Sequence, residues 1–164
     1  MTASSHPHFA RPDKRTWSLV DANGKVLGSL VKPSWLSRRV ELTVATGLYE
    51  VRPLKTWSSS VGCFFGEVPL RVAKFTWRGV EVRTTSGDVL FKIVQKGWFS
   101  STYRIVDHTG LERYTLRTRM AWKRFDREHE LAHVGGEPLE PLDLLFLLQV
   151  VIIQLDRAAA AAAA

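Results

Sequence analysis

Five basic residues close together in the sequence could bind an anionic ligand. Like-charged side chains at two-residue steps along a strand repel one another, and a bound polyanion relieves that repulsion. Arg suits phosphate in particular, because its planar guanidinium group can donate two hydrogen bonds at once. The alternative is an ordinary solvated basic face that resists association between sheets. The candidate residues are Arg117, Arg119, Lys123, Arg124 and Arg127.

A second pattern could bind zinc. Residues 129–133 read His-Glu-Leu-Ala-His and match H-E-x-x-H, which on a helix presents two imidazoles to Zn and a Glu base. Leu139 stands where the longer form of this pattern has a third His. The segment resembles a short charged connector, so a zinc metalloprotease using His129, Glu130 and His133 is a second alternative, and no metal or cofactor is expected. Alanine at any of these three positions should change fold and function little.

Short strands are the elements that must position these residues. Between Thr16 and Phe125, short apolar runs alternate with turn signals such as Asn23-Gly24, which is typical of a tight hairpin. Trp122 shares a predicted strand face with Tyr114, opposite the basic side chains. The predicted strands are 17–20, 25–31, 40–44, 48–52, 55–60, 61–65, 70–77, 80–85, 88–94, 101–107, 111–118 and 120–125. Such a series, with no convincing helix before Asp126, indicates a sandwich or barrel.

An internal repeat favours the barrel. Gly24 to Leu48 aligns without a gap with Gly87 to Leu111, and nine of the 25 pairs are identical. Two long copies are too few for a solenoid, so we interpret them as two halves of one closed sheet. Closure removes exposed sheet edges, and a barrel of about twelve strands has room inside for a helix.

The segment from Pro141 to Arg157 supplies that helix. From Leu142 to Leu155 only Asp143, Gln149 and Gln154 are not apolar, so the predicted helix has no polar face. A helix that is apolar nearly all round is enclosed by protein or by lipid. Its fourteen residues span ~21 Å, short of the ~30 Å hydrocarbon core, so we expect a helix inside the barrel and no transmembrane span. Aspartate at Leu147 or Ile152 should therefore unfold the domain.

The duplicated, Trp-containing β region followed by an apolar helix that ends in Leu155-Asp156-Arg157 resembles the Tubby C-terminal-like superfamily. That superfamily includes Tubby proteins, phospholipid scramblases and the LURP-one-related proteins. The resemblance covers residues 16–157 and implies a twelve-stranded barrel around a central helix, with anionic phospholipid binding as in Tubby proteins. This chain has neither the Cys-rich segment nor the Pro-rich tail associated with scramblases.

Composition and charge set the remaining expectations. The formal charge of +7 favours anionic partners, and the lone Cys63, which we expect in the core, fits a reducing compartment. We therefore predict a cytoplasmic protein, with a peripheral location at the membrane as a further expectation. Its expected organisation is a flexible leader at 1–15, one barrel domain at 16–157 with its central helix at 141–157, and an Ala tail at 158–164.

These features together predict a non-enzymatic binding module. The first expectation for its partner is an anionic, phosphoinositide-like phospholipid at a membrane surface. The first alternative is single-stranded nucleic acid, because basic strands interleaved with Trp and Tyr can also hold single strands.

Overall fold

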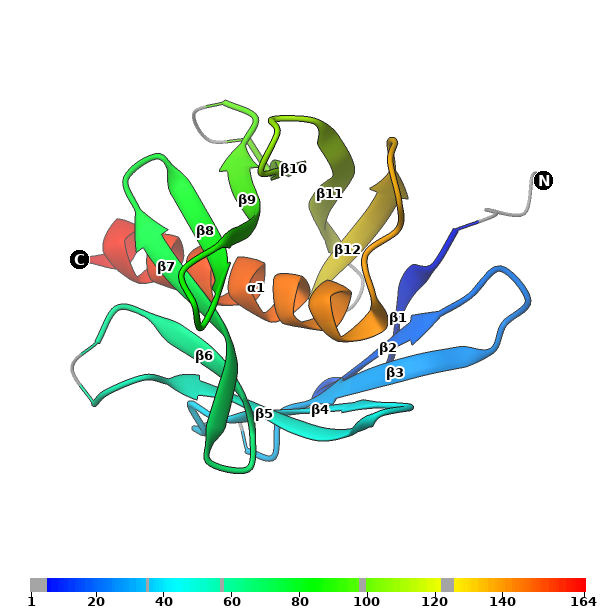
Figure 1. Cartoon of the computed structure of the whole chain (residues 1–164), viewed down its shortest axis with the longest axis horizontal. Helices are drawn as coiled ribbons and strands as arrows, with labels where there is room; N and C mark the ends of the chain where they lie inside the picture. The colour runs from blue at the N-terminus through cyan, green and yellow to red at the C-terminus, as the bar shows by residue number, and fades with distance from the viewer. Residues whose placement is uncertain (1–5, 35, 57, 98–99, 122–125) are drawn as a thin grey trace.

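The computed structural model describes residues 6–34, 36–56, 58–97, 100–121 and 126–164. Over these residues the chain forms twelve β-strands and one α-helix (Figure 1). The strands are β1 (His8–Asp13), β2 (Thr16–Val20), β3 (Val26–Val31), β4 (Val40–Val44), β5 (Gly47–Pro53), β6 (Val61–Phe65), β7 (Val68–Thr76), β8 (Gly79–Thr84), β9 (Val89–Gln95), β10 (Thr102–Asp107), β11 (Glu112–Ala121) and β12 (Asp126–His133). The helix is α1 (Pro141–Ala163).

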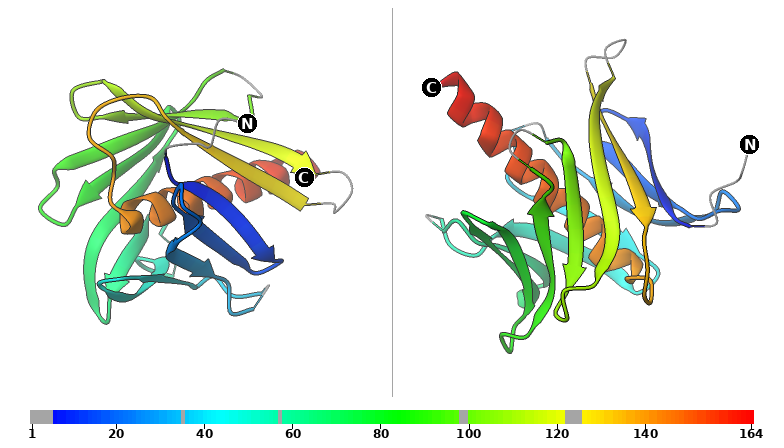
Figure 2. Two further views of the ribbon diagram at one scale, coloured as in Figure 1. Left: turned by 90° about the vertical axis from the view of Figure 1, so that its right-hand side faces the viewer. Right: turned by 90° about the horizontal axis from the view of Figure 1, so that it is seen from above.

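The strands form one sheet in which each pairs antiparallel with the next in sequence, from β1 to β12. The sheet curls around α1 and brings its two end strands, β1 and β12, side by side (Figure 2). Across that seam, Arg11 Nη1 donates to the carbonyl oxygen of Arg127 at 3.4 Å. The predicted fold class is therefore confirmed as a mainly β, nearly closed barrel of twelve antiparallel strands with a C-terminal helix.

Enclosure explains why α1 is apolar on all sides. Leu144 to Leu148, Val150 and Val151 are each no more than 1% exposed, and they pack with the inward residues of the strands in one core. The helix is exposed from Asp156 onward and leaves the barrel at one end (Figure 2). It includes the predicted segment and continues through Ala163.

Among the described residues, α1 is the one helix with the length and hydropathy to cross a membrane. In its most apolar 18-residue window, 44% of the residues are buried inside the protein. A core helix passes the same test of length and composition, so the apolar sequence of α1 is accounted for by its place in the barrel.

The repeat corresponds to strands that stand six places apart in the sheet. Its first copy covers β3 and β4, and its second covers β9 and β10. Equivalent positions are buried in both halves, as with Leu30 and Ile93 or Leu42 and Ile105. The constant offset between the two copies therefore keeps equivalent residues on the inward face of each pair of strands.

Three local sequence predictions were wrong. His8–Asp13, predicted as part of a flexible leader, forms β1, and residues 126–133, read as a connector, form β12. The predicted strand at 55–60 is a loop in its described part. Of the predicted strand at 120–125, residues 120–121 belong to β11, and residues 122–125, with Trp122, lie outside the described part.

The two end strands, β1 and β12, were not predicted from the sequence because one contains a proline and the other is rich in charged residues. Pro12 in β1 lies within a register shift between Ala10 and Asp13, where a missing amide donor is tolerated. In β12, Glu128 and Glu130 are exposed while His129 and Leu131 are buried, so exposed and buried side chains alternate as in any strand with one buried face. Of the two buried residues only Leu131 is apolar, so the hydrophobic pattern is weak.

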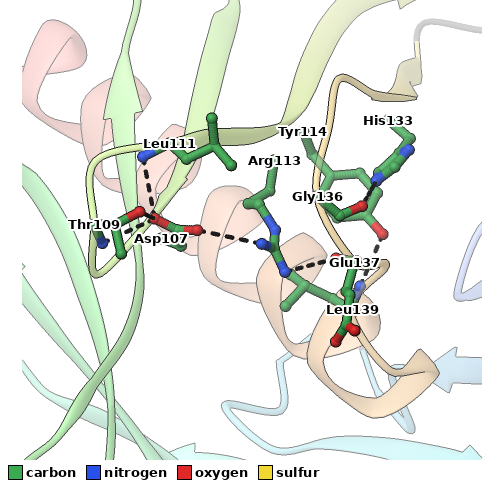
Figure 3. A network of polar contacts seen from close by, with 9 residues as sticks. All are labelled: Asp107, Thr109, Leu111, Arg113, Tyr114, His133, Gly136, Glu137 and Leu139. Atoms are coloured by element: carbon green, nitrogen blue, oxygen red, sulfur yellow. Dashed lines mark hydrogen bonds and ion pairs between the residues drawn. The ribbon is translucent and has the colours of Figure 1, made fainter.

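Polar contacts fix the connection that leads from β12 into α1 (Figure 3). Arg113 donates to Asp107 Oδ2 at 3.2 Å and to the carbonyl oxygen of Glu137 at 2.7 Å. The backbone amide of Leu139 donates to the Tyr114 hydroxyl oxygen at 2.9 Å. These contacts bind the connection to β10 and β11 and thereby set where α1 enters the barrel.

Among the described residues, an ion pair inside the barrel joins α1 to the sheet. Arg71 Nε donates to Asp143 Oδ1 at 3.0 Å. Burial raises the pKa of Asp143 above its ordinary value, and the positive charge of Arg71 partly opposes that rise. This contact joins β7 to the first turn of α1.

Candidate anion-binding groove

A groove of about 1010 Å³ opens at the end of the barrel where α1 emerges. It lies between the C-terminal half of the helix and strands from both ends of the sheet, because closure brings β1, β2 and β3 near β11 and β12 (Figure 2). Its volume is at the upper end of the ~300–1,000 Å³ range typical of small-molecule sites.

Positive charge dominates this groove. Among the described residues that line it, seven side chains are cationic and one is a carboxylate, that of Asp156. Such an excess of one sign beside low-dielectric walls concentrates the field and attracts oppositely charged ligands. The cationic lining residues are Arg11, Lys14, Arg15, Lys32, Arg38, Arg127 and Arg157.

Neutral partners hold several of these guanidinium groups in place. Arg11 lies 4.7 Å from the ring centroid of Trp17 and donates to the carbonyl oxygen of Lys14 at 2.6 Å. Arg15 donates to the carbonyl oxygen of Pro33 at 3.0 Å, and Arg157 donates to that of Ser59 at 3.2 Å. Carbonyl and aromatic contacts of this kind orient a cation without cancelling its charge.

Asp156 is the acidic exception. Its Oδ1 pairs with Arg127 Nη1 at 2.8 Å and so joins α1 to β12 at the groove. Within the described part of the chain, the side chains of Lys14, Lys32 and Arg38 have neither a hydrogen bond nor an ion pair. These three side chains can therefore reach an incoming anion without first breaking an internal contact.

The inner lining is mostly apolar. Trp17, Leu30 and Val61 contribute from the strands, and Ile152 and Ile153 contribute from α1. Trp17 is only 6% exposed, so its ring forms part of the core rather than an open stacking platform. The groove therefore combines a cationic rim with an aliphatic interior.

The structure separates the basic residues that the sequence had grouped. Arg117 and Arg119 are exposed on the outer face of β11, as strand alternation predicted. In the register of β11 and β12 they stand opposite Glu130 and Glu128, and Arg119 pairs with both carboxylates. These acidic neighbours offset the positive charge of that outer face.

Of the predicted anion-binding residues that the structure describes, Arg127 is the one that lines the groove. It belongs to β12 and stands two positions before the buried His129. Its side chain is therefore on the same, inward side of the strand as that of His129. Lys123 and Arg124 lie outside the described residues.

The H-E-x-x-H residues lie on β12 instead of a helix. His129 is buried and its Nδ1 lies 2.8 Å from Thr118 Oγ1, whereas Glu130 faces outward toward Arg119. His133 Nε2 contacts the carbonyl oxygen of Gly136 at 3.0 Å. Four residues of strand span ~13 Å, whereas two imidazoles on one Zn each lie ~2.1 Å from it. Among the described residues, no group of three His, Cys, Asp or Glu could hold a metal ion.

This placement changes the prediction for the His129→Ala variant. His129 is 4% exposed, contacts Thr118 and packs edge-on to Trp17 with ring centroids 4.9 Å apart. Leaving the buried Thr118 hydroxyl unpaired should cost ~1–3 kcal/mol of unfolding free energy. Urea denaturation followed by circular dichroism measures the loss, with the exposed Glu130→Ala as control at under ~0.5 kcal/mol. Equal midpoints for the two variants would contradict a structural role for His129.

Cys63 occupies the predicted core position. It is fully buried, and burial raises the pKa of its thiol to about 12. At neutral pH the side chain is therefore a thiol, and a thiol is a weak nucleophile compared with a thiolate.

Sequence reasoning missed six of the seven groove cations. Five of the six come from residues 11–38, which the pairing of neighbouring strands brings together, and barrel closure with α1 adds Arg127 and Arg157 to them. The available signal was local density: residues 11–15 hold three cations, and Lys32 and Arg38 flank the loop after β3.

Comparison with known proteins adds information about fold. No model of a known protein family matches the chain, and no curated protein matches it. The crystal structure of the Arabidopsis thaliana protein AT5G01750 is similar, with a TM-score of 0.58 and 14% sequence identity over 94% of each chain. That likeness extends over nearly the whole of both chains and supports the barrel architecture.

Proposed function

We propose that this protein is a non-enzymatic module that binds anionic phospholipid at a membrane surface, using the groove beside α1. The observation that carries the proposal is the charge of the lining, seven cations against one carboxylate, above an aliphatic interior. Phosphate groups are suited to the cationic rim, because Arg and Lys both donate charge-assisted hydrogen bonds to phosphate oxygens. The resemblance to the Tubby C-terminal-like superfamily is consistent with this ligand class.

Exposed apolar side chains near the groove support a membrane rather than a soluble anion. Leu36 is 72% exposed in the loop between Lys32 and Arg38, and Met120, which lines the groove, is 45% exposed. Apolar groups beside cations can enter the headgroup region while the cations meet lipid phosphates. In the proposed function, the protein is cytoplasmic and attaches peripherally with this end of the barrel facing the membrane.

Single-stranded nucleic acid is supported less well. Proteins that hold single strands without sequence preference offer several exposed aromatic rings on which successive bases stack. Trp17 is the one aromatic residue among the described groove lining other than His129, and it is buried with Arg11 over its ring. An oligonucleotide would therefore find charge in this groove but little stacking surface.

Sedimentation with vesicles tests the proposal. The protein should bind phosphatidylcholine vesicles that contain phosphatidylglycerol, phosphatidylserine or a phosphoinositide, and should bind pure phosphatidylcholine weakly. Binding should weaken as salt is added, because exposed charges are screened beyond ~8–10 Å at physiological ionic strength. Equal sedimentation with neutral and anionic vesicles at low salt would reject the proposal. Preferential capture by a single-stranded oligonucleotide competitor would favour the nucleic-acid alternative.

A further inference from the structure

One polar residue of α1 lines the groove without using its hydrogen-bonding groups. Gln149 is 8% exposed, and within the described part of the chain its side-chain amide makes no hydrogen bond. Its amide atoms are not among the fully buried polar atoms without a partner, so they are open to the groove, whereas Asp143, another buried polar residue of this helix, is paired with Arg71. The Gln149 amide therefore offers a donor and an acceptor to whatever occupies the groove.

Polar and charged side chains follow one another along the side of α1 that lines the groove. Gln149, Ile152, Asp156 and Ala160 recur at steps of three or four residues and so share one face of α1. Asp156 pairs with Arg127, which places that cation about two helical turns, or ~10 Å along the helix, farther out than Gln149. An occupant thus meets cations first and an uncharged amide deeper inside.

From this order we infer that the groove takes a phospholipid headgroup first, and that Gln149 selects headgroups whose outer end is an uncharged hydroxyl. The phosphate lies just inside the rim, where the long Lys and Arg side chains can reach it, so that the hydroxyl reaches the Gln149 amide while the acyl chains stay at the membrane. The serine of phosphatidylserine ends in an ammonium and a carboxylate, and both charges would lose hydration beside an amide that is uncharged. Phosphatidylglycerol and phosphatidylserine carry the same net charge, so this selection is separate from charge alone. The inference rests on the proposed function.

The test compares phosphatidylglycerol and phosphatidylserine vesicles of equal anionic content. The unmodified protein should bind phosphatidylglycerol about ten-fold more tightly, a difference that corresponds to about one net hydrogen bond. Gln149→Leu, which keeps the position buried, should reduce phosphatidylglycerol binding to the phosphatidylserine level. Gln154→Leu is the matched control on the same helix outside the groove lining, and it should keep the preference. Circular dichroism melts verify that both variants fold.

A membrane-free measurement separates this inference from the proposed function. Glycerophosphoglycerol and glycerophosphoserine are titrated into the protein and followed by NMR, with Gln149→Leu alongside. If vesicles fail to bind but glycerophosphoglycerol binds in a Gln149-dependent manner, headgroup selection stands and the membrane role falls. Equal binding of the two headgroups by the unmodified protein, an unchanged preference in Gln149→Leu, or no binding in either assay would overturn the inference.

Discussion

Replacing Leu147 with Asp is expected to abolish cooperative folding. Leu147 lies on α1 and is completely buried in the barrel core. Loss of the leucine contacts alone costs ~2–5 kcal/mol, and burying an unpaired carboxylate adds several more. Together these costs approach the ~5–15 kcal/mol that stabilises a typical domain. A thermal melt followed by circular dichroism should show no cooperative transition.

Ile152→Asp is the matched control for that variant. The sequence predicted unfolding at both positions, but Ile152 is half-buried and lines the cationic groove. A carboxylate there keeps contact with solvent and nearby cations, so the variant should melt cooperatively, with a midpoint lowered by roughly 2–8 °C. If Leu147→Asp melted like Ile152→Asp, the helix would not be the core of the barrel.

Removing three groove cations should nearly eliminate binding to anionic vesicles. Lys14, Lys32 and Arg38 line the groove and have no internal partner within the described residues. Each basic residue near an anionic surface contributes ~1 kcal/mol, so replacing all three with Ala should weaken binding by roughly two decades. The fold should survive, because these side chains lie at the groove rim and make none of the core contacts. Vesicle sedimentation at low salt measures the loss.

A second triple variant controls for net charge. Lys25, Lys74 and Lys96 are exposed and lie outside the groove lining, so replacing them with Ala removes the same formal charge. This variant should bind anionic vesicles within about three-fold of the unmodified protein, since charges far from the contact are largely screened. Equal losses of binding for the two triple variants would indicate attraction by overall charge and would show that the groove is not the binding site.

The architecture was accessible from sequence because two strong patterns agreed. An apolar segment without a polar face requires an enclosure, and a duplicated strand pattern can provide one. Residues such as Leu42 and Ile105 reported the inward face through simple alternation. The end strands gave weaker signals, because Pro12 lies at a register shift and β12 places His129 on its inward face.

The groove could not be located from sequence for a geometric reason. Its cations come from separate segments, and Arg11 meets Arg127 only when the first and last strands come together. Local density instead favoured Arg117 and Arg119. Whether acidic residues stand opposite them depends on the register of β11 and β12, which sequence reasoning did not assign because it had not predicted β12 as a strand.

Photo-crosslinking tests most directly whether anionic phospholipid binds in the groove. Vesicles containing phosphatidylglycerol with a photoactivatable group on its headgroup are irradiated with the protein, and the modified peptides are identified by mass spectrometry. The proposed function predicts adducts within residues 11–17, 30–38 and 149–160, three segments that contribute side chains to the groove. Adducts confined to the outer face of β11 around Arg117 and Arg119, with none in these three segments, would contradict it.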